Sequence, residues 1–231
     1  MTLVNSCVIF ASNRIAEEMN EIADLRREYS QAALDLDSAN KEPIKQFETW
    51  FKEAKEAEIL EPNAMVLSTV DAEGMPFQRT VLMKALDERG VVFYTNYKSR
   101  KAQQMAQNSK VSILFPWYAL ERQVLITGDA EKVSTQESMA YFASRPFGSR
   151  LGAWVSHQSQ VISSRSILEM KLAEMKQKFK DGKVPLPDFW GGYRFVPTSF
   201  DFWQGRKNRL HDRLLYTQSP EGDWRIERMA P

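Results

Sequence analysis

The fold is decided by residues 64–85, which read AMVLSTVDAEGMPFQRTVLMKA. Two β-prone runs, Ala64–Val70 and Phe77–Ala85, lie on either side of Asp71-Ala72-Glu73-Gly74. That tetrapeptide has the Asp and Gly that tight turns favour. The stretch therefore predicts two antiparallel strands joined by a short turn.

Further strands follow this hairpin at short intervals. A second turn, Asp87-Glu88-Arg89-Gly90, leads into Val91–Thr95, and a short helix is expected over Ser99–Asn108. Two more strands are predicted at Val111–Phe115 and Gln123–Val133. At least five strands, joined mostly by short turns, indicate an antiparallel meander or barrel rather than a doubly wound sheet.

Helices flank this strand-rich middle. Residues from about Asn13 to Leu36 are helix-prone, and the next helix should begin near Pro43. Ser134-Thr135-Gln136-Glu137 matches a capping box. A longer helix is expected over Ser164–Lys180, with an apolar stripe typical of core or subunit contact. We therefore expect a mainly β protein with flanking helices, in the α+β class.

The last third of the chain alternates linkers with short strands. Val184-Pro185-Leu186-Pro187 should be a stiff linker, and Gly191-Gly192 a flexible joint. The strands expected beyond this point are Tyr193–Val196, Phe200–Trp203, His211–Thr217 and Trp224–Arg228.

Composition bounds the class of protein. The 231 residues suffice for one large domain, and 43% hydrophobic with 26% charged residues is ordinary for a globular protein. A formal charge of +1 argues against a general nucleic-acid binder. The single cysteine, Cys7, fits a reducing compartment, so we expect a cytoplasmic protein. No Cys/His cluster indicates a metal site, and no apolar run approaches the roughly 18–20 residues of a membrane span.

Two clusters in the strand-rich part carry cations. The strand Arg79–Lys84 has a cation at each end, and alternation places these two side chains on opposite faces. In Tyr94–Lys101 a strand ends and a helix starts, and Arg100 and Lys101 in the first helical turn oppose the helix dipole. A bound phosphate would explain them. The alternative for Arg79–Lys84 is a half-exposed strand, and the alternative for Tyr94–Lys101 is a solvated turn.

Two later clusters suggest a ligand that is flat and anionic. Tyr141 and Arg145 are one helical turn apart, and Ser149 lies just beyond, so three donors can converge on one phosphate. The alternative is an ordinary helix end. Residues 202–213 combine a Trp, four cations and a His, which suits a ring that bears a phosphate.

In their joint order, these segments resemble the pyridoxine/pyridoxamine 5′-phosphate oxidase family. The resemblance covers the chain from about Leu25 to Pro231. The motifs that carry it are Arg26-Arg27-Glu28-Tyr29, Arg79–Lys84, Phe93-Tyr94-Thr95-Asn96, Ser99-Arg100-Lys101, Leu114-Phe115-Pro116-Trp117, Glu121-Arg122-Gln123-Val124, Gly152-Ala153-Trp154-Val155-Ser156, Gln158-Ser159, Val184-Pro185-Leu186-Pro187, Phe189-Trp190-Gly191-Gly192, Phe202-Trp203-Gln204-Gly205 and Arg209-Leu210-His211-Asp212-Arg213.

The resemblance implies an FMN-binding split β-barrel, antiparallel and homodimeric, with FMN at the subunit interface. The implied reaction oxidises pyridoxamine 5′-phosphate and pyridoxine 5′-phosphate to pyridoxal 5′-phosphate, in vitamin B6 biosynthesis and salvage. FMN would be the hydride acceptor and O2 the reoxidant, giving H2O2. We expect no metal, nucleic-acid or membrane partner.

The resemblance also implies roles for single residues. Arg209 and His211 would be the catalytic pair, fixing and polarising the substrate above the flavin. Substrate contacts are implied for Lys84, Tyr141, Arg145, Ser149, Arg209, Leu210, His211, Arg26 and Tyr29. FMN contacts are implied for Arg79, Thr80, Val81, Leu82, Met83, Lys84, Tyr94, Thr95, Arg100, Lys101, Gln123, Gln158, Ser159, Trp203 and Arg213.

Three parts of one domain are expected. Residues 1–40 would form an N-terminal tail and helix, partly flexible, and residues 41–185 the FMN-binding split-barrel core. Residues 186–231 would form a C-terminal segment for dimerisation and substrate contact. Arg206 and Lys207 are expected to face solvent.

Two other functions stay open at this point. One is a different flavin reductase or oxidase on the same barrel, because one fold hosts many functions. The other is a carrier of flavin or vitamer phosphate without enzymatic activity. Tyr141, Arg145 and Ser149 favour the oxidase over another flavin enzyme, and turnover with O2 separates it from a carrier. The sequence does not rank the two substrates.

Overall fold

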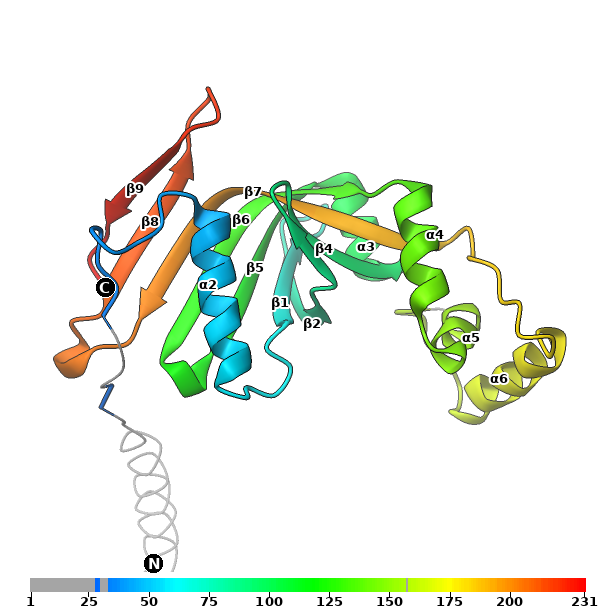
Figure 1. The fold of residues 1–231 in the computed structure, drawn as a ribbon. Helices are drawn as coiled ribbons and strands as arrows, with labels where there is room; N and C mark the ends of the chain where they lie inside the picture. The colour runs from blue at the N-terminus through cyan, green and yellow to red at the C-terminus, as the bar shows by residue number, and fades with distance from the viewer. Residues whose placement is uncertain (1–27, 30–32, 157) are drawn as a thin grey trace, which may run out of the picture.

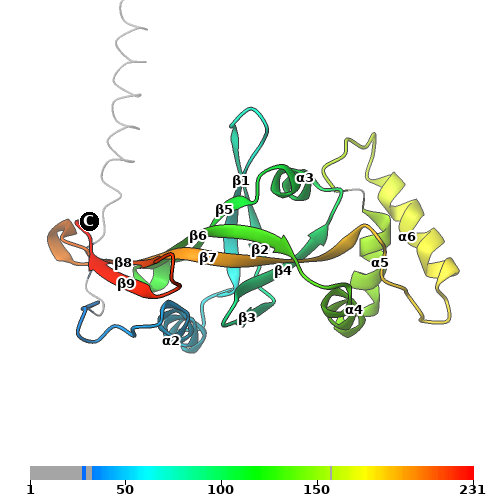
Figure 2. The same cartoon turned by 90° about the horizontal axis from the view of Figure 1, so that it is seen from above.

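One long strand organises the sheet. In the computed structural model, which describes residues 28–29, 33–156 and 158–231, strand β7 (Trp190–Gln204) pairs along one edge with β6 (Arg122–Lys132). Its other edge pairs first with β4 (Gly90–Asn96) and then with β8 (Asp212–Gln218). Strand β7 therefore runs through the middle of the molecule and connects its two ends (Figures 1 and 2).

The other elements extend this sheet or cover it. All pairings are antiparallel, in the order β2-β1-β5-β6-β7-β4-β3, with β8 on β7 and β9 on β8. The remaining strands are β1 (Ala64–Val70), β2 (Pro76–Leu82), β3 (Ala85–Asp87), β5 (Lys110–Trp117) and β9 (Trp224–Arg228). The helices are α2 (Pro43–Glu56), α3 (Arg100–Gln107), α4 (Thr135–Ser144), α5 (Phe147–Val155) and α6 (Ser166–Lys178), with 3-10 turns at Tyr118–Leu120 and Lys207–Arg209.

A glycine and a proline allow β7 to change partners. The register between β6 and β7 shifts at Thr127 and Gly128, and a Cβ on Gly128 would lie only 2.0 Å from the carbonyl oxygen of Val196. Pro197, the next residue, has no N–H to donate to a neighbour. Strand β7 therefore pairs with β4 before Pro197 and with β8 after it, and it remains one continuous strand.

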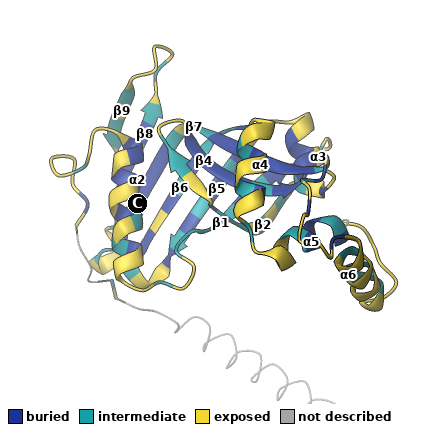
Figure 3. Ribbon diagram, turned by 45° about the vertical axis from the view of Figure 1, so that its right-hand side comes forward, coloured by how far each residue is buried: buried dark blue, intermediate teal, exposed yellow. Residues whose placement is uncertain are grey.

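The core has a large and a small part. In the large part, α2 packs Phe47 and Trp50 against the sheet, where Phe47 meets Phe115 at a centroid distance of 4.8 Å. The small part joins α4, α5 and the end of β7 through Phe142, Leu151 and other apolar side chains. Figure 3 shows buried strands at the centre and, at one end, α6, which has no buried residue. None of the helices that the structure describes is long and apolar enough to cross a membrane.

Most of the predicted elements are confirmed. The β1–β2 hairpin forms with Gly74 at φ 84° and with the Asp71 carboxylate accepting from the backbone of Met75. The capping box at the start of α4 is present in both directions between Ser134 and Glu137. The mainly β, antiparallel architecture with flanking helices is as predicted.

Several local predictions are wrong. The strand predicted to reach Ala85 ends at Leu82, because the N–H of Lys84 turns to the carbonyl of Val92 and β3 pairs with β4 instead. Gly191 and Gly192 are no flexible joint but lie inside β7, where the rings of Tyr97 and Tyr94 leave no room for a Cβ.

The two strands predicted on either side of Pro197 are one strand. In addition, α5 was not predicted, since Pro146 and Gly148 read as the end of a helix rather than the beginning of the next one. The helix predicted from Asn13 lies mostly outside the described residues, and residues 33–36 are not helical.

Candidate active site

A cation-lined cavity lies where β2, the beginning of α3 and the loop after α5 meet. Its volume is about 330 Å³, and its lining is Phe77, Gln78, Arg79, Arg100, Lys101 and Ser159. The backbone N–H of Arg100 donates to Ser159 Oγ at 3.2 Å, and the Arg100 guanidinium lies 5.2 Å from the centre of the Phe77 ring. The loop after α5 is thereby attached to the first turn of α3.

Arg79 is held firmly in this cavity. Its Nη1 donates to Thr69 Oγ1 at 2.6 Å and to the carbonyl of Leu67 at 3.1 Å. Thr69 donates in turn to Gln104 Oε1 at 2.6 Å, so both β1 and α3 fix the guanidinium. Burial, and then the positive charge of Arg100, lower the pKa of Arg79. A bound anion would oppose this shift, because a nearby negative charge favours the charged form of the guanidinium.

Lys101 reaches the same cavity from the first turn of α3. Its Nζ donates to Thr95 Oγ1 at 3.2 Å and to Gln158 Oε1 at 3.3 Å. Burial, followed by the charge of Arg79, lowers the pKa of Lys101 to about 8. Among the described residues, no ion pair involves Arg79, Arg100 or Lys101. Three converging cations at a helix N-terminus, with no carboxylate among the described residues that line the cavity, suit a phosphate group.

A row across three strands brings together three of the predicted flavin contacts. Gln123 on β6 is directly opposite Trp203 on β7, which is directly opposite Arg213 on β8. Arg213 Nε and Nη2 donate to the Asp201 carboxylate at 2.5–3.0 Å, which raises the pKa of Arg213. Directly opposed residues share a face of the sheet, so this row presents an amide, an indole and a fixed guanidinium side by side.

A second aromatic group surrounds Arg145 at the opposite end of β7. The ring of Tyr94 stacks on Tyr141 at a centroid distance of 3.9 Å and on Trp190 at 5.4 Å. The Arg145 guanidinium lies 4.7 Å from the centre of the Trp190 ring, and its buried Nη1 has no hydrogen-bond partner in the part of the chain that the structure describes. Burial lowers the pKa of Arg145, and Tyr141 partly offsets this shift. A buried, unpaired guanidinium N–H of this kind suits an anionic ligand group. Ser149 lies on α5 and is exposed.

The turn after β7 presents His211 beside Trp203. Their ring centroids are 4.5 Å apart, and Tyr29 meets both rings edge-on at 5.9 Å and 5.5 Å. The backbone N–H of Arg206 donates to His211 Nδ1 at 3.0 Å, whereas Nε2 has no hydrogen bond to any described residue. Burial and then the charge of Arg209 lower the pKa of His211.

The predictions for this turn are partly wrong. Arg206 does not simply face solvent, because its Nε pairs with Asp212 at 3.5 Å. Lys207 is exposed, as predicted. Asn208 and Arg209 both adopt positive φ, at 55° and 60°, in the left-handed region that most side chains avoid. This strained turn places Arg209 at the surface next to His211.

The predicted site residues thus form separate groups at different places in a single chain. The turn with Arg209 and His211 lies at the β8–β9 end, and helix α4, which carries Tyr141 and is followed by Arg145, lies at the opposite end (Figures 1 and 2). Arg26 lies outside the described residues.

The residues of the strand that was predicted to contact the flavin also differ in their burial. The side chains of Val81 and Met83 lie against or within the core, whereas Thr80 and Lys84 are exposed. The sequence reasoning missed Thr69, Gln104 and Trp190, which support the cations rather than present charge themselves. Only the proximity of β1, α3 and β7 in space reveals them.

Fold and site together define an antiparallel split barrel that binds phosphorylated aromatic ligands. Residues 51–179 match the family model described as pyridoxamine 5′-phosphate oxidase, and residues 190–231 match the pyridoxine 5′-phosphate oxidase C-terminal dimerisation region. The chain belongs to the pyridoxine/pyridoxamine 5′-phosphate oxidase family.

Curated relatives and solved structures agree with this assignment. The chain is 57% identical over 211 residues to the pyridoxine/pyridoxamine 5′-phosphate oxidase of Aliarcobacter butzleri (strain RM4018), covering 91% of this chain and 100% of the relative. It is 58% identical over 213 residues to that of Crocosphaera subtropica (strain ATCC 51142 / BH68), with coverage of 91% and 100%. The crystal structure of PhzG from Burkholderia lata 383 in complex with tetrahydrophenazine-1-carboxylic acid has a TM-score of 0.82 at 29% identity, covering 87% of this chain and 100% of that one.

A more distant structure shares the fold. A pyridoxamine 5′-phosphate oxidase-related, FMN binding protein from Nostoc punctiforme has a TM-score of 0.65 at 18% identity, covering 82% of this chain and 98% of that one.

Proposed function

We infer that this chain is an FMN-dependent oxidoreductase that converts pyridoxamine 5′-phosphate and pyridoxine 5′-phosphate to pyridoxal 5′-phosphate. The reaction belongs to vitamin B6 biosynthesis and salvage. The observation that carries the inference is a group of three cations, one from β2 and two from the first turn of α3, with no carboxylate among the described lining residues, on a chain 57% identical to an oxidase of this name. The enzyme acts on a CH–NH2 or CH–OH group with O2 as acceptor.

The residues present fit FMN as the cofactor. Arg79, Arg100 and Lys101 would hold its phosphate, supported by Thr95 and by Gln158 and Ser159 of the loop after α5. The row formed by Gln123, Trp203 and Arg213 offers an amide, a flat ring and a cation to the isoalloxazine, and Thr80, Val81, Leu82, Met83, Lys84 and Tyr94 would complete the contacts. Bound FMN supplies hydride acceptance from C4′ of the substrate, with O2 as the reoxidant that yields H2O2.

The substrate would be held by its phosphate at one end and by its ring at the other. Lys84, Tyr141, Arg145 and Ser149 would bind the phosphate, and the buried unpaired Nη1 of Arg145 supports this role. Arg209, Leu210 and His211, with Arg26 and Tyr29, would cover the ring. Arg209 and His211 orient and polarise the reacting carbon, with His211 Nε2 as the nitrogen that the backbone leaves unbonded.

A second copy of the chain completes this site. The phosphate-binding helix α4 and the turn that carries Arg209 lie at opposite ends of one chain (Figures 1 and 2), so one substrate contacts both only if they come from two chains. The match of residues 190–231 to a dimerisation region supports a homodimer. FMN would then lie at the interface, between the core of residues 41–185 and the partner's segment 186–231, with residues 1–40 as a partly flexible N-terminal part. We place the enzyme in the cytoplasm.

An aerobic assay tests the proposal. The purified protein should be yellow and release FMN on denaturation. With pyridoxamine 5′-phosphate or pyridoxine 5′-phosphate it should produce the aldehyde and H2O2. A flavin-loaded protein that oxidises neither substrate would support a different flavin enzyme or a carrier, and a protein that binds no added FMN would contradict the proposal altogether.

A further inference from the structure

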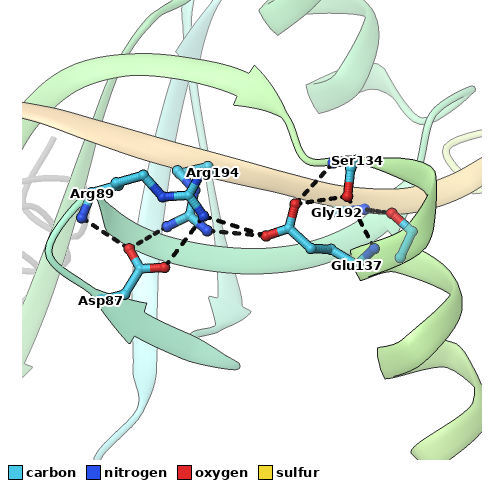
Figure 4. A network of polar contacts seen from close by, with 7 residues as sticks. Asp87, Arg89, Ser134, Glu137, Gly192 and Arg194 are labelled. Atoms are coloured by element: carbon cyan, nitrogen blue, oxygen red, sulfur yellow. Dashed lines mark hydrogen bonds and ion pairs between the residues drawn. The ribbon is translucent and has the colours of Figure 1, made fainter.

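Arg194 joins two elements that the proposed function makes part of the substrate site. It lies on β7 and is 3% exposed. Its Nη1 donates to Asp87 Oδ1 at 2.5 Å, and its Nη2 donates to Glu137 Oε1 at 3.3 Å (Figure 4). Asp87 is the last residue of β3, and Glu137 is in the first turn of α4. One planar guanidinium therefore connects a strand of the barrel to the beginning of a helix.

Proposed phosphate ligands lie on or directly beside both connected elements. Strand β3 begins directly after Lys84, and α4 carries Tyr141 in its last turn and is followed directly by Arg145. Glu137 and Tyr141 are four residues apart, so they lie on the same face of the helix. A shift of α4 relative to β3 would therefore change the separation of the cations and hydroxyl that bind one phosphate.

The Glu137 carboxylate divides its two oxygens between two tasks. Oε2 accepts from the backbone N–H of Ser134 at 3.1 Å and from its hydroxyl at 2.9 Å, which completes the capping box. Oε1 faces Arg194 (Figure 4). The cap does not depend on Arg194, so the ion pair bears on where α4 sits on β7, together with the hydrogen bond from Gly192 N–H to Ser138 Oγ, rather than on whether the helix forms.

Burial shows which member of the network tolerates substitution. The side chains of Asp87 and Glu137 are 43% and 41% exposed, whereas Arg194 is enclosed. Loss of both carboxylates would leave a buried, unpaired cation, which strongly destabilises proteins. Loss of Arg194 leaves two carboxylates that water can reach, so an apolar replacement of similar length should fold.

Resting on the proposed function, we propose that Arg194 is a positioning residue for the substrate phosphate. It holds β3 and α4 in the arrangement in which Lys84, Tyr141 and Arg145 converge on that group. A lysine carries one point charge and cannot bridge both carboxylates as the guanidinium fork does. The role therefore requires arginine.

Steady-state kinetics on the FMN-loaded enzyme test this proposal. Arg194→Met should raise KM for pyridoxamine 5′-phosphate roughly tenfold while kcat and the Kd of FMN change less than about twofold, because ground-state phosphate binding is lost. Inorganic phosphate, used as a competitive inhibitor, should show a similar rise in its inhibition constant. Arg194→Lys should give an intermediate KM.

Arg89 provides a matched control on the same two carboxylates. It contacts Asp87 and Glu137 at 3.6 Å each, but it is 65% exposed. Arg89→Ala should therefore leave KM unchanged.

The outcomes separate the two proposals. If the unsubstituted enzyme does not oxidise pyridoxamine 5′-phosphate, the proposed function fails. If the unsubstituted enzyme does oxidise it, either of two results with Arg194→Met overturns the positioning role. One is an unchanged KM. The other is a rise in KM that is accompanied by losses of kcat, FMN affinity and thermal stability. Should Arg194→Met not fold, Glu137→Gln decides: it retains a capping acceptor at an exposed position, and an unchanged KM in that variant refutes the role.

Discussion

The cavity at the beginning of α3 and the turn after β7 are built in contrasting ways. In the cavity, Arg79 and Lys101 are half-buried and already bonded to Thr69, Thr95 and other neutral side chains. In the turn, Arg209 is exposed and adopts positive φ. One region is complete within a single chain, whereas the other presents its residues outward. The contrast is consistent with our proposal that the cofactor phosphate is bound by one chain and that the substrate is enclosed only by two.

The largest expected effect comes from the exposed turn. Arg209→Ala should lower kcat/KM for pyridoxamine 5′-phosphate by roughly a hundredfold, because misplacement of a substrate by about 1 Å has effects of that size. FMN content should stay normal, since the cofactor cavity does not include this residue. Steady-state kinetics with the flavin absorbance spectrum measures both. Loss of FMN with normal turnover after resupply would contradict the assignment to the substrate.

In the cavity, by contrast, we expect a substitution to weaken FMN binding and to leave turnover nearly unchanged. Arg79→Ala should weaken FMN binding between about 10-fold and 100-fold, the range for one lost charge-assisted hydrogen bond. At saturating FMN its kcat should be close to normal. Titration of FMN into apoprotein, followed by flavin fluorescence, gives the Kd. An unchanged Kd would mean that these cations bind something else.

Arg145 should respond as a ligand of the substrate phosphate. Arg145→Ala is expected to raise KM by about tenfold, because it removes binding that substrate and transition state share. The kinetics of Arg145→Lys provide the comparison, since lysine keeps the charge but loses the flat contact with Trp190. A selective fall in kcat at constant KM would assign Arg145 to the chemical step instead.

The smallest effect concerns pH. Burial and the charge of Arg79 lower the pKa of Lys101 to about 8 in the protein without ligand. Phosphate recognition needs the ammonium form, so FMN affinity should fall several-fold as the pH rises from about 7 to 9. The folding stability of the apoprotein should change with pH in the opposite direction to FMN affinity. Above about pH 8 the unfolded chain binds more protons than the folded chain, so the apoprotein should gain stability there.

Calorimetric titration of FMN into apoprotein at both pH values measures this fall in affinity. Lys101→Met should bind FMN more weakly at pH 7 and should lack most of the further decrease. If FMN affinity decreases equally steeply with pH in Lys101→Met, a group other than Lys101 causes the pH dependence.

Local signals made most of the elements predictable from the sequence. Asp71 and Gly74 determine a turn by themselves, and Ser134 with Glu137 determines the beginning of a helix. The continuity of β7 through Pro197 was not predictable in this way, because it depends on Gly128 in a neighbouring strand. The same limit applies to the site. The cations are visible in the sequence, but Trp190 and Arg194 act through residues more than forty positions away.

Complementation between two variants tests most directly whether two chains build the substrate site. Arg145→Ala and Arg209→Ala chains, co-produced with different affinity tags and purified as the mixed dimer, should regain about half of the normal activity at substrate well below KM. One of the two sites in that dimer receives both residues intact, as two-fold symmetry requires. Activity no higher than that of the two variant homodimers would contradict a site shared between chains.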